Sequence, residues 1–100
     1  MNRKVAYIAG KITGEPNYKE KFQKVADKYI AKGFTVLNPA ILPESEHISQ
    51  DNYMTICLSM LKVSDIIVML PDWESSVGAT MELSQAYVWK KEVIKEKANE

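Results

Sequence analysis

The chain has 100 residues, of which 46% are hydrophobic, and its 13 basic residues balance its 13 acidic ones. This length supports one domain with one core, which we expect to span residues 1–100. Neutral charge argues against binding of duplex nucleic acid, where contacts to phosphates supply most of the affinity. No apolar run approaches the roughly 20 residues of a membrane span, and we expect no signal peptide.

The single cysteine and the single histidine exclude two further kinds of protein. Cys57 has no second cysteine with which to form a disulfide within the chain, which fits a reducing compartment. His47 has no partner cysteines, so we expect no metal site. We predict a cytoplasmic protein that binds a small molecule or another protein, and neither duplex nucleic acid nor a membrane.

The first third of the chain predicts a strand, a tight loop and a helix. Residues 4–9 are almost continuously apolar, as in a strand buried on both faces. The loop 10–16 holds two glycines and a proline, which end this strand. From Asn17 onward apolar residues recur at helical spacing, so we predict a helix that Asn17 caps and Gly33 ends.

A second strand and a second helix follow. Residues 34–37 are strand-prone and end at Asn38 and Pro39, after which a polar loop extends to about residue 50. The next helix has an apolar stripe formed by Tyr53, Ile56, Cys57, Met60 and Leu61. Ser49 and Asp51 are both suited to cap the start of this helix.

The last part of the chain continues the alternation. Residues 66–70 predict the clearest buried strand. The loop 71–76 leads to a predicted helix over residues 77–90, and residues 91–94 predict a fourth short strand. This order predicts an α/β fold: a small doubly wound parallel sheet of about four strands with helices on both faces, similar to Rossmann and flavodoxin-like sheets.

Ligands of such sheets bind beyond the carboxyl ends of the strands, where three of the predicted loops meet. The loop from Gly10 to Gly14 has the position of a phosphate-binding loop, but it matches neither the P-loop nor the dinucleotide fingerprint. Two glycines in a tight turn also occur without any ligand. The loop alone therefore leaves phosphate binding open.

Glu82 is the most informative polar residue of the predicted third helix. It lies at the boundary between the apolar stripe and solvent, and its neighbours one turn away include the small residues Gly78, Ala79 and Ala86. A carboxylate beside small side chains leaves room for a ligand. The alternative is an ordinary surface glutamate, which the pattern alone favours because charged residues are mostly exposed.

Five other residues have alternative interpretations. Ser75 or Ser76 caps the third helix, where free amides also attract anions. Tyr7 lies in a buried strand, where its hydroxyl needs a hydrogen-bond partner. Trp73 either anchors its loop or stacks on a base. Cys57 lies on an apolar stripe, which indicates a packed thiol.

Four segments carry a family resemblance when they are taken together. In chain order they are Tyr7–Gly14, Asn38–Pro39, Ser64–Pro71 and Trp73–Glu82. Over nearly the whole chain they resemble the nucleoside 2-deoxyribosyltransferase-like superfamily. The last segment reads Trp-Glu-x-Ser-x-Gly-Ala-x-x-Glu, which is the most specific of the four and is similar to a compact, often phage-encoded branch.

The resemblance implies cleavage of the N-glycosidic bond of a deoxynucleoside or its 5′-monophosphate, by hydrolysis or by transfer. It implies that Glu82 attacks the anomeric carbon and that Tyr7 holds the Glu82 carboxylate. A carboxylate suits this chemistry because it can stabilise an oxocarbenium-like transition state and form a covalent glycosyl intermediate. Asp72 is the nearest unassigned carboxylate, and we consider it as the general acid.

Three positions depart from the pattern of the superfamily. Ser76 stands where the transferases have an Asp, and it resembles the branch that hydrolyses nucleoside 5′-monophosphates, in which this Ser contacts phosphate. Cys57 stands where many relatives have an Asp, and a thiol is a poor substitute for that carboxylate. Thr13 stands where the hydrolase branch has a basic residue, although Lys11 is two residues away.

The leading hypothesis is an enzyme that acts on a small nucleoside or nucleotide without a cofactor or metal. The predicted catalytic residues are Glu82, Tyr7 and Asp72, and the predicted substrate-binding residues are Gly10, Lys11, Thr13, Gly14, Asn38, Trp73, Ser76 and Gly78. Two alternatives stay open: a nucleotide-binding module without catalysis, which Cys57 favours, and a structural or protein-interaction domain.

The second helix also predicts self-association. It carries Met54, Leu58 and Met60 in addition to its apolar stripe, so it is apolar on more than one face. A small domain covers only part of such a helix, and closed two-fold dimers are the commonest homo-oligomers. Relatives in the superfamily also assemble. We therefore predict a homodimer or larger homo-oligomer with this helix in the interface.

Overall fold

The computed structural model of the protein describes residues 4–98. Residues 1–3, in the segment where we expect no signal peptide, lie outside this range. The elements are β1 (Val5–Ala9), α1 (Tyr18–Ala31), β2 (Thr35–Leu37), the 3-10 helix η1 (Pro39–Ile41), α2 (Gln50–Lys62), β3 (Ile66–Met69), the 3-10 helix η2 (Trp73–Ser75), α3 (Val77–Val88) and β4 (Glu92–Lys95). Within the described range, no helix is long and apolar enough to cross a membrane.

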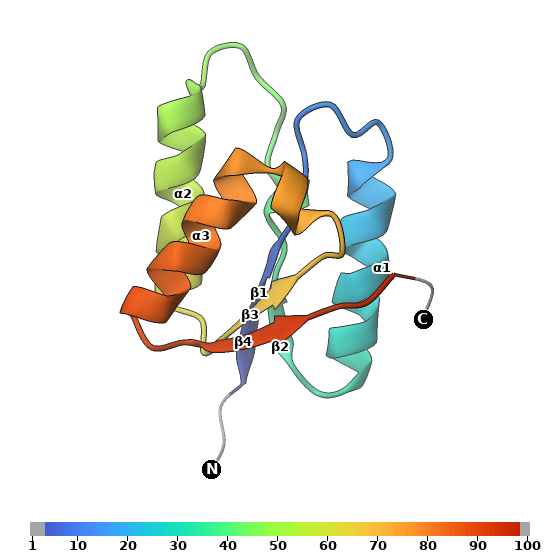
Figure 1. Ribbon diagram of the computed structural model, residues 1–100. Helices are drawn as coiled ribbons and strands as arrows, with labels where there is room; N and C mark the ends of the chain where they lie inside the picture. The colour runs from blue at the N-terminus through green and yellow to red at the C-terminus, as the bar shows by residue number, and fades with distance from the viewer. Residues whose placement is uncertain (1–3, 99–100) are drawn as a thin grey trace.

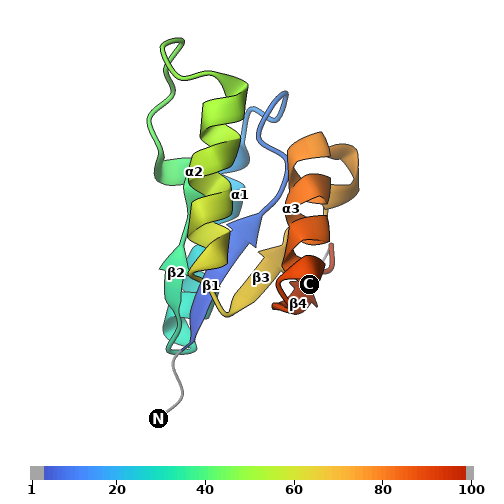
Figure 2. The ribbon, with the colours of Figure 1, turned by 90° about the vertical axis from the view of Figure 1, so that its left-hand side faces the viewer.

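The strands form one parallel sheet in the order β2-β1-β3-β4. Helix α1 lies on one face of this sheet, and α2 and α3 lie on the other, as Figures 1 and 2 show from two directions. The chain therefore moves outward from β1 in one direction to β2 and in the other to β3 and β4. This arrangement confirms the predicted α/β fold and places the reversal of strand order between β1 and β3.

The core follows the two-residue period of the buried strands. Ile8 of β1 faces α1 and packs against Phe22 and Ala26. Tyr7, the preceding residue, faces the opposite way and packs in a cluster with Leu61 of α2 and Leu83 of α3. Because the sheet is covered on both faces, its central strands are apolar at every position except Tyr7, whose hydroxyl needs a partner.

The structure selects one of the two predicted caps for α2 and for α3, and it differs from the prediction at the start of α1. Ser49 and not Asp51 caps α2, and Ser76 and not Ser75 caps α3, where its Oγ accepts a hydrogen bond from the Ala79 amide at 3.0 Å. Asn17 stands before α1 but makes no side-chain cap hydrogen bond.

Helix α3 ends at Val88, two residues before the predicted end. Lys90 has a positive φ of 59°, a left-handed conformation that an α-helix does not contain. Strand β4 begins at Glu92 and ends at Lys95, so it lies one residue later in the chain than predicted.

The apolar surface of α2 is arranged differently from the predicted stripe. Ile56, predicted to face the core, is 37% exposed. Leu58, assigned to a second face, packs against the core cluster on the α2 and α3 side of the sheet. Met54 also packs within the same chain, against α3. A Cβ added to Gly78 of α3 would lie only 3.2 Å from Cε of Met54. Part of the extra apolar surface of α2 therefore packs against α3.

Close packing requires glycine at position 10, directly after β1. A Cβ at this position would lie 2.6 Å from Cδ1 and 2.8 Å from Cβ of the buried Leu70. The second of these atoms is fixed to the backbone and cannot move aside. Gly10 therefore lets the chain cross the end of β3 and begin the loop to α1.

We expect Gly10→Ala to lower the free energy of unfolding by about 1–3 kcal/mol, the usual cost of overpacking a core. Gly78→Ala is the matched control. Its new methyl group meets only the flexible end of Met54, so its effect should be well below 1 kcal/mol in either direction, by the same reasoning. Urea unfolding of both variants measures the difference. Equal stability of Gly10→Ala and the parent protein would contradict the packing argument.

Candidate active site

A cavity of about 810 Å³ opens at the carboxyl ends of β1 and β2 and beside the start of α3. This is the edge of a doubly wound sheet where ligands bind. Five stretches of the described chain enclose the cavity: the glycine loop (residues 10–16), the start of α1, residues 39–45, α2 from Gln50 to Cys57 and the first half of α3.

Glu82 of α3 and Tyr7 of β1 meet at the inner end of this cavity. The Tyr7 hydroxyl donates a hydrogen bond of 2.5 Å to Oε2 of Glu82. Tyr7 is fully buried and Glu82 is only 6% exposed, yet Glu82 lines the cavity. Tyr7 was expected to need a hydrogen-bond partner, and Glu82 is that partner.

The surroundings of this pair control its protonation. Burial raises the pKa of Glu82 to about 7, and the hydrogen bond from Tyr7 offsets part of this rise. Burial and the neighbouring Glu82 charge hold the pKa of Tyr7 well above its usual value, so the phenol keeps its proton and stays a donor. Burial also raises the pKa of the nearby Cys57 thiol. The cavity thus holds a carboxylate that changes charge near neutral pH.

Six of the predicted site residues line the cavity. They are Gly10, Thr13, Gly14, Ser76, Gly78 and Glu82. Cys57, which the sequence places where many superfamily relatives have an Asp, lines it as well. Tyr7 lies behind Glu82 and reaches the cavity only through that carboxylate. Residues from β1, α2 and α3 that are far apart in the chain therefore lie together in the structure.

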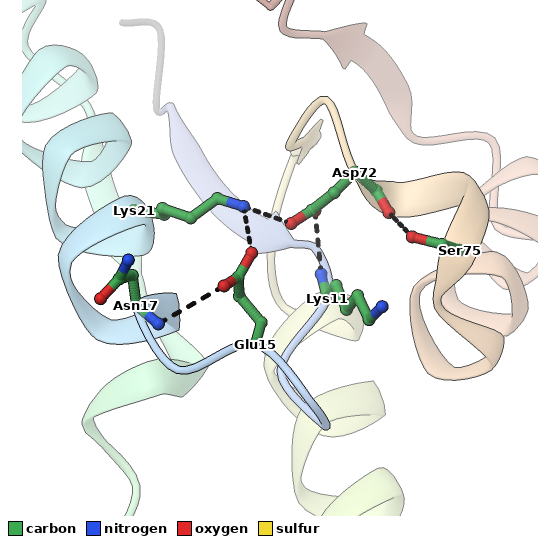
Figure 3. Close-up of polar contacts among 6 residues, drawn as sticks. All are labelled: Lys11, Glu15, Asn17, Lys21, Asp72 and Ser75. Atoms are coloured by element: carbon green, nitrogen blue, oxygen red, sulfur yellow. Dashed lines mark hydrogen bonds and ion pairs between the residues drawn. The ribbon is translucent and has the colours of Figure 1, made fainter.

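Asp72 lies elsewhere, which argues against the general-acid role considered for it. Its side chain does not line the cavity. One carboxylate oxygen accepts a hydrogen bond from the Lys11 amide at 3.1 Å, and the other lies 2.7 Å from Nζ of Lys21 (Figure 3). Both oxygens of Asp72 therefore have partners outside the cavity, and neither is placed to give a proton to a ligand within it.

Three further predicted residues lie outside the main cavity. Asn38 is buried, and its side chain caps η1 by accepting a hydrogen bond from the Ala40 amide. Trp73 packs against the core, and Nζ of Lys95 lies 5.0 Å from its ring centroid. Lys11 lines a smaller hollow of about 450 Å³ beside the start of α3. Trp73 therefore anchors its loop, the alternative considered for it.

The sequence analysis missed one wall of the cavity, which residues 42–45 form with Tyr18 and Tyr53. The Tyr53 hydroxyl donates to the Pro43 carbonyl oxygen and accepts a hydrogen bond from the Ser45 amide at 2.9 Å. Tyr53 was assigned to the apolar stripe of its helix, and its position at the start of that helix gave no sign of this contact. A tyrosine near a helix start beside a proline-containing loop is the one available signal.

Comparisons with known proteins identify the domain family and the fold. Residues 4–95 match the family described as Domain of unknown function (DUF4406). Among solved structures, the chain is similar to a 2-desoxiribosyltransferase from Leishmania mexicana, with a TM-score of 0.75 and 21% sequence identity. The match covers 96% of this chain and 65% of that one, so the chain spans just under two thirds of its relative. No curated protein matches the sequence. The fold of the resembled superfamily is thereby confirmed.

The raised pKa of Glu82 predicts how stability depends on pH. The folded state binds a proton at Glu82 up to about pH 7, whereas the unfolded state loses it near 4.5. The free energy of unfolding therefore falls as pH rises between these values. Glu82→Gln keeps an acceptor for Tyr7 without the charge, and should be more stable than the parent at pH 8 by about 1–3 kcal/mol.

Urea unfolding at pH 4 and pH 8 measures this effect. At pH 4 the two proteins should be similarly stable, because Glu82 is then protonated in both states. Glu20→Gln, at an exposed position of α1, is the matched control and should leave the pH dependence unchanged. A Glu82→Gln protein that is less stable than the parent at pH 8 would contradict the buried-carboxylate account.

Proposed function

The chain belongs to the domain family described as DUF4406, and we propose that it cleaves the N-glycosidic bond of a deoxynucleoside or its 5′-monophosphate. The observation that carries this proposal is the hydrogen bond between the buried Tyr7 hydroxyl and the Glu82 carboxylate at the inner end of the cavity. The similarity of the fold to that of a 2-desoxiribosyltransferase supports the choice of reaction.

The three carboxylates that line the cavity differ in a way that singles out Glu82. Glu15 lies 2.7 Å from Nζ of Lys21, and Glu44 lies 2.9 Å from Nζ of Lys19. Glu82 instead faces a neutral hydroxyl. An ammonium partner lowers the nucleophilicity of a carboxylate, whereas a desolvated carboxylate beside a neutral donor is more reactive and remains oriented.

The proposed reaction has two balanced steps. A Glu82 oxygen forms a bond to the anomeric carbon of the sugar while the C–N bond breaks, and the leaving base takes the electron pair of that bond and a proton from solvent water. Water, or an N–H nitrogen of a second base, then attacks the same carbon, gives up its proton to solvent and releases the Glu82 carboxylate. Tyr7 holds the attacking carboxylate in place throughout, because its own hydroxyl keeps its proton.

The ligand is proposed to be phosphorylated. Ser76 caps α3 and lines the cavity with Gly78. Within the described part of the chain, the amides of Val77 and Gly78 have no protein acceptor. Free amides at the start of a helix attract an anion, whereas an Asp at position 76 would repel it. A 5′-monophosphate therefore suits this end of the cavity better than an uncharged nucleoside.

One observation favours a second candidate function, a nucleotide-binding module without catalysis. Asp72 is engaged by Lys21 and does not line the cavity, and Cys57 has a thiol whose pKa burial raises. Asp72 is therefore not placed to protonate a leaving base, and the Cys57 thiol is a weak acid. Binding of a nucleotide without release of free base would support this second candidate.

The enzyme proposal predicts a characteristic pH profile. Only the ionised form of Glu82 attacks the sugar, so release of free base should rise with pH, with an apparent pKa of about 7, and level off above pH 8. Release is measured chromatographically with a panel of deoxynucleosides and their 5′-monophosphates. Glu82→Gln should lower the rate by at least about 1,000-fold.

The control for this experiment is Glu74→Gln, which changes an exposed glutamate of η2 outside the cavity. It should leave the rate unchanged. Base release by Glu82→Gln at the parent rate would refute the role of Glu82. No release from any substrate, together with saturable binding, would leave the binding-module candidate as the better account.

We also propose that the protein self-associates through the outer surfaces of α2 and α3. Ile56, Val77 and Met81 are 37%, 80% and 52% exposed there. Clustered apolar exposure often marks an interface between protein copies. Sedimentation equilibrium at micromolar concentration should give at least the dimer mass, and Met81→Lys should shift it toward the monomer. A monomer mass for the parent protein would refute this proposal.

A further inference from the structure

We propose that Lys21 is a positioning residue whose ammonium group joins two loops and so fixes the glycine loop as a wall of the cavity. Lys21 belongs to α1 and is not itself among the residues that line the cavity, whereas its partner Glu15 is. Its effect on ligand binding rests on the function proposed above. Its effect on the loop does not.

Lys21 bridges two carboxylates from different parts of the chain. Its Nζ lies 2.7 Å from Oε2 of Glu15, which lines the cavity, and 2.7 Å from Oδ2 of Asp72, which follows β3. Figure 3 shows the ammonium group between the two acidic side chains. A helix residue therefore connects the loops that follow the two central strands of the sheet.

The backbone continues this connection into the glycine loop. The other oxygen of Asp72 accepts a hydrogen bond from the Lys11 amide at 3.1 Å, one residue after Gly10. The Asn17 amide points at Oε1 of Glu15 from 3.5 Å, at the far end of the same loop (Figure 3). The loop is thus held at both ends by carboxylates, and Lys21 holds both carboxylates.

Electrostatics explains why a cation is needed here. Glu15 and Asp72 repel each other, and Lys21 lies between them and compensates this repulsion. The side chains are only 21–37% exposed, so water screens the charges incompletely. The proximity of Asp72 and then of Glu15 raises the pKa of Lys21, so the ammonium form persists at neutral pH. Without it, the two loops would separate.

The loss of Lys21 should therefore affect a charged ligand more than an uncharged one. Glu15 would face the cavity without its cation, and its charge would repel a phosphate. The glycine loop would also lose the anchor that Asp72 gives to Lys11. If Lys21 contributed only to overall stability, its loss would instead lower the affinity for charged and uncharged ligands equally. It would also speed amide exchange throughout the sheet.

The test uses the full chain with Lys21→Met, the rescue variant Lys21→Arg and the control Lys24→Met. Lys24 is exposed on the same helix and has no ion pair among the described residues, so the control removes the same charge. Amide hydrogen exchange by NMR reports Lys11 and, as an internal reference for global stability, Ile67 of β3. Calorimetry with matched deoxynucleosides and 5′-monophosphates reports binding.

In Lys21→Met, exchange at Lys11 should be at least about tenfold faster while exchange at Ile67 stays unchanged. The affinity for the monophosphates should fall by about fivefold or more. The affinity for the nucleosides should fall by a smaller factor. Lys21→Arg should restore most of the protection from exchange at Lys11 and most of the affinity for the monophosphates, because a guanidinium group can bind two carboxylates.

Unchanged exchange at Lys11, or equal acceleration at Lys11 and Ile67, would overturn the loop-positioning role. Faster exchange at Lys11 with unchanged affinities would overturn its importance for binding. If the parent protein binds no compound of the panel, the proposed function fails, while the exchange rates still decide whether Lys21 positions the loop.

Discussion

The arrangement of this protein depends on the need to bury one carboxylate with a partner that does not cancel its charge. A carboxylate removed from water is costly unless hydrogen bonds satisfy it. Glu82 is satisfied by the hydroxyl of Tyr7, which lies on β1, a central strand bonded to neighbours on both sides. The donor that orients the Glu82 carboxylate is therefore fixed by the centre of the sheet. Three of its four neighbours one turn away on α3 are small, namely Gly78, Ala79 and Ala86, and Glu82 lines the cavity together with Gly78 and Ala79.

Among residues 4–98, Glu82 is the one cavity carboxylate without a cationic partner. Lys19 and Lys21, both on α1, pair with Glu44 and Glu15 at the cavity wall. The same helix thus neutralises the wall and, through Asp72, ties the loop after β3 to the glycine loop. The Tyr7–Glu82 pair lies on one face of the sheet, and α1 on the other face supplies the cations that pair with the wall carboxylates.

The sequence predicted the features that depend on short-range pattern. Apolar runs and glycines predicted the strands, their order along the chain and the parallel sheet, and the small residues beside Glu82 indicated room for a ligand. Features that depend on which distant side chain arrives nearby were not predictable. Nothing in the sequence around Asp72 indicates a cationic partner, because its partner Lys21 is distant in the chain and lies beside it only in the fold. Tyr53 likewise reads as a core residue, although its hydroxyl holds the wall at residues 43–45.

The central claim is that Glu82 is a buried carboxyl group whose charge changes near neutral pH while Tyr7 donates to it. The most direct measurement is an NMR titration of the side-chain carboxyl carbon of Glu82 in ¹³C-labelled protein. The account predicts a pKa of about 7, and a higher pKa in Tyr7→Phe because the ionised form loses its donor. A Glu82 pKa near the ordinary value of 4.5, unaffected by the loss of the Tyr7 hydroxyl, would contradict it.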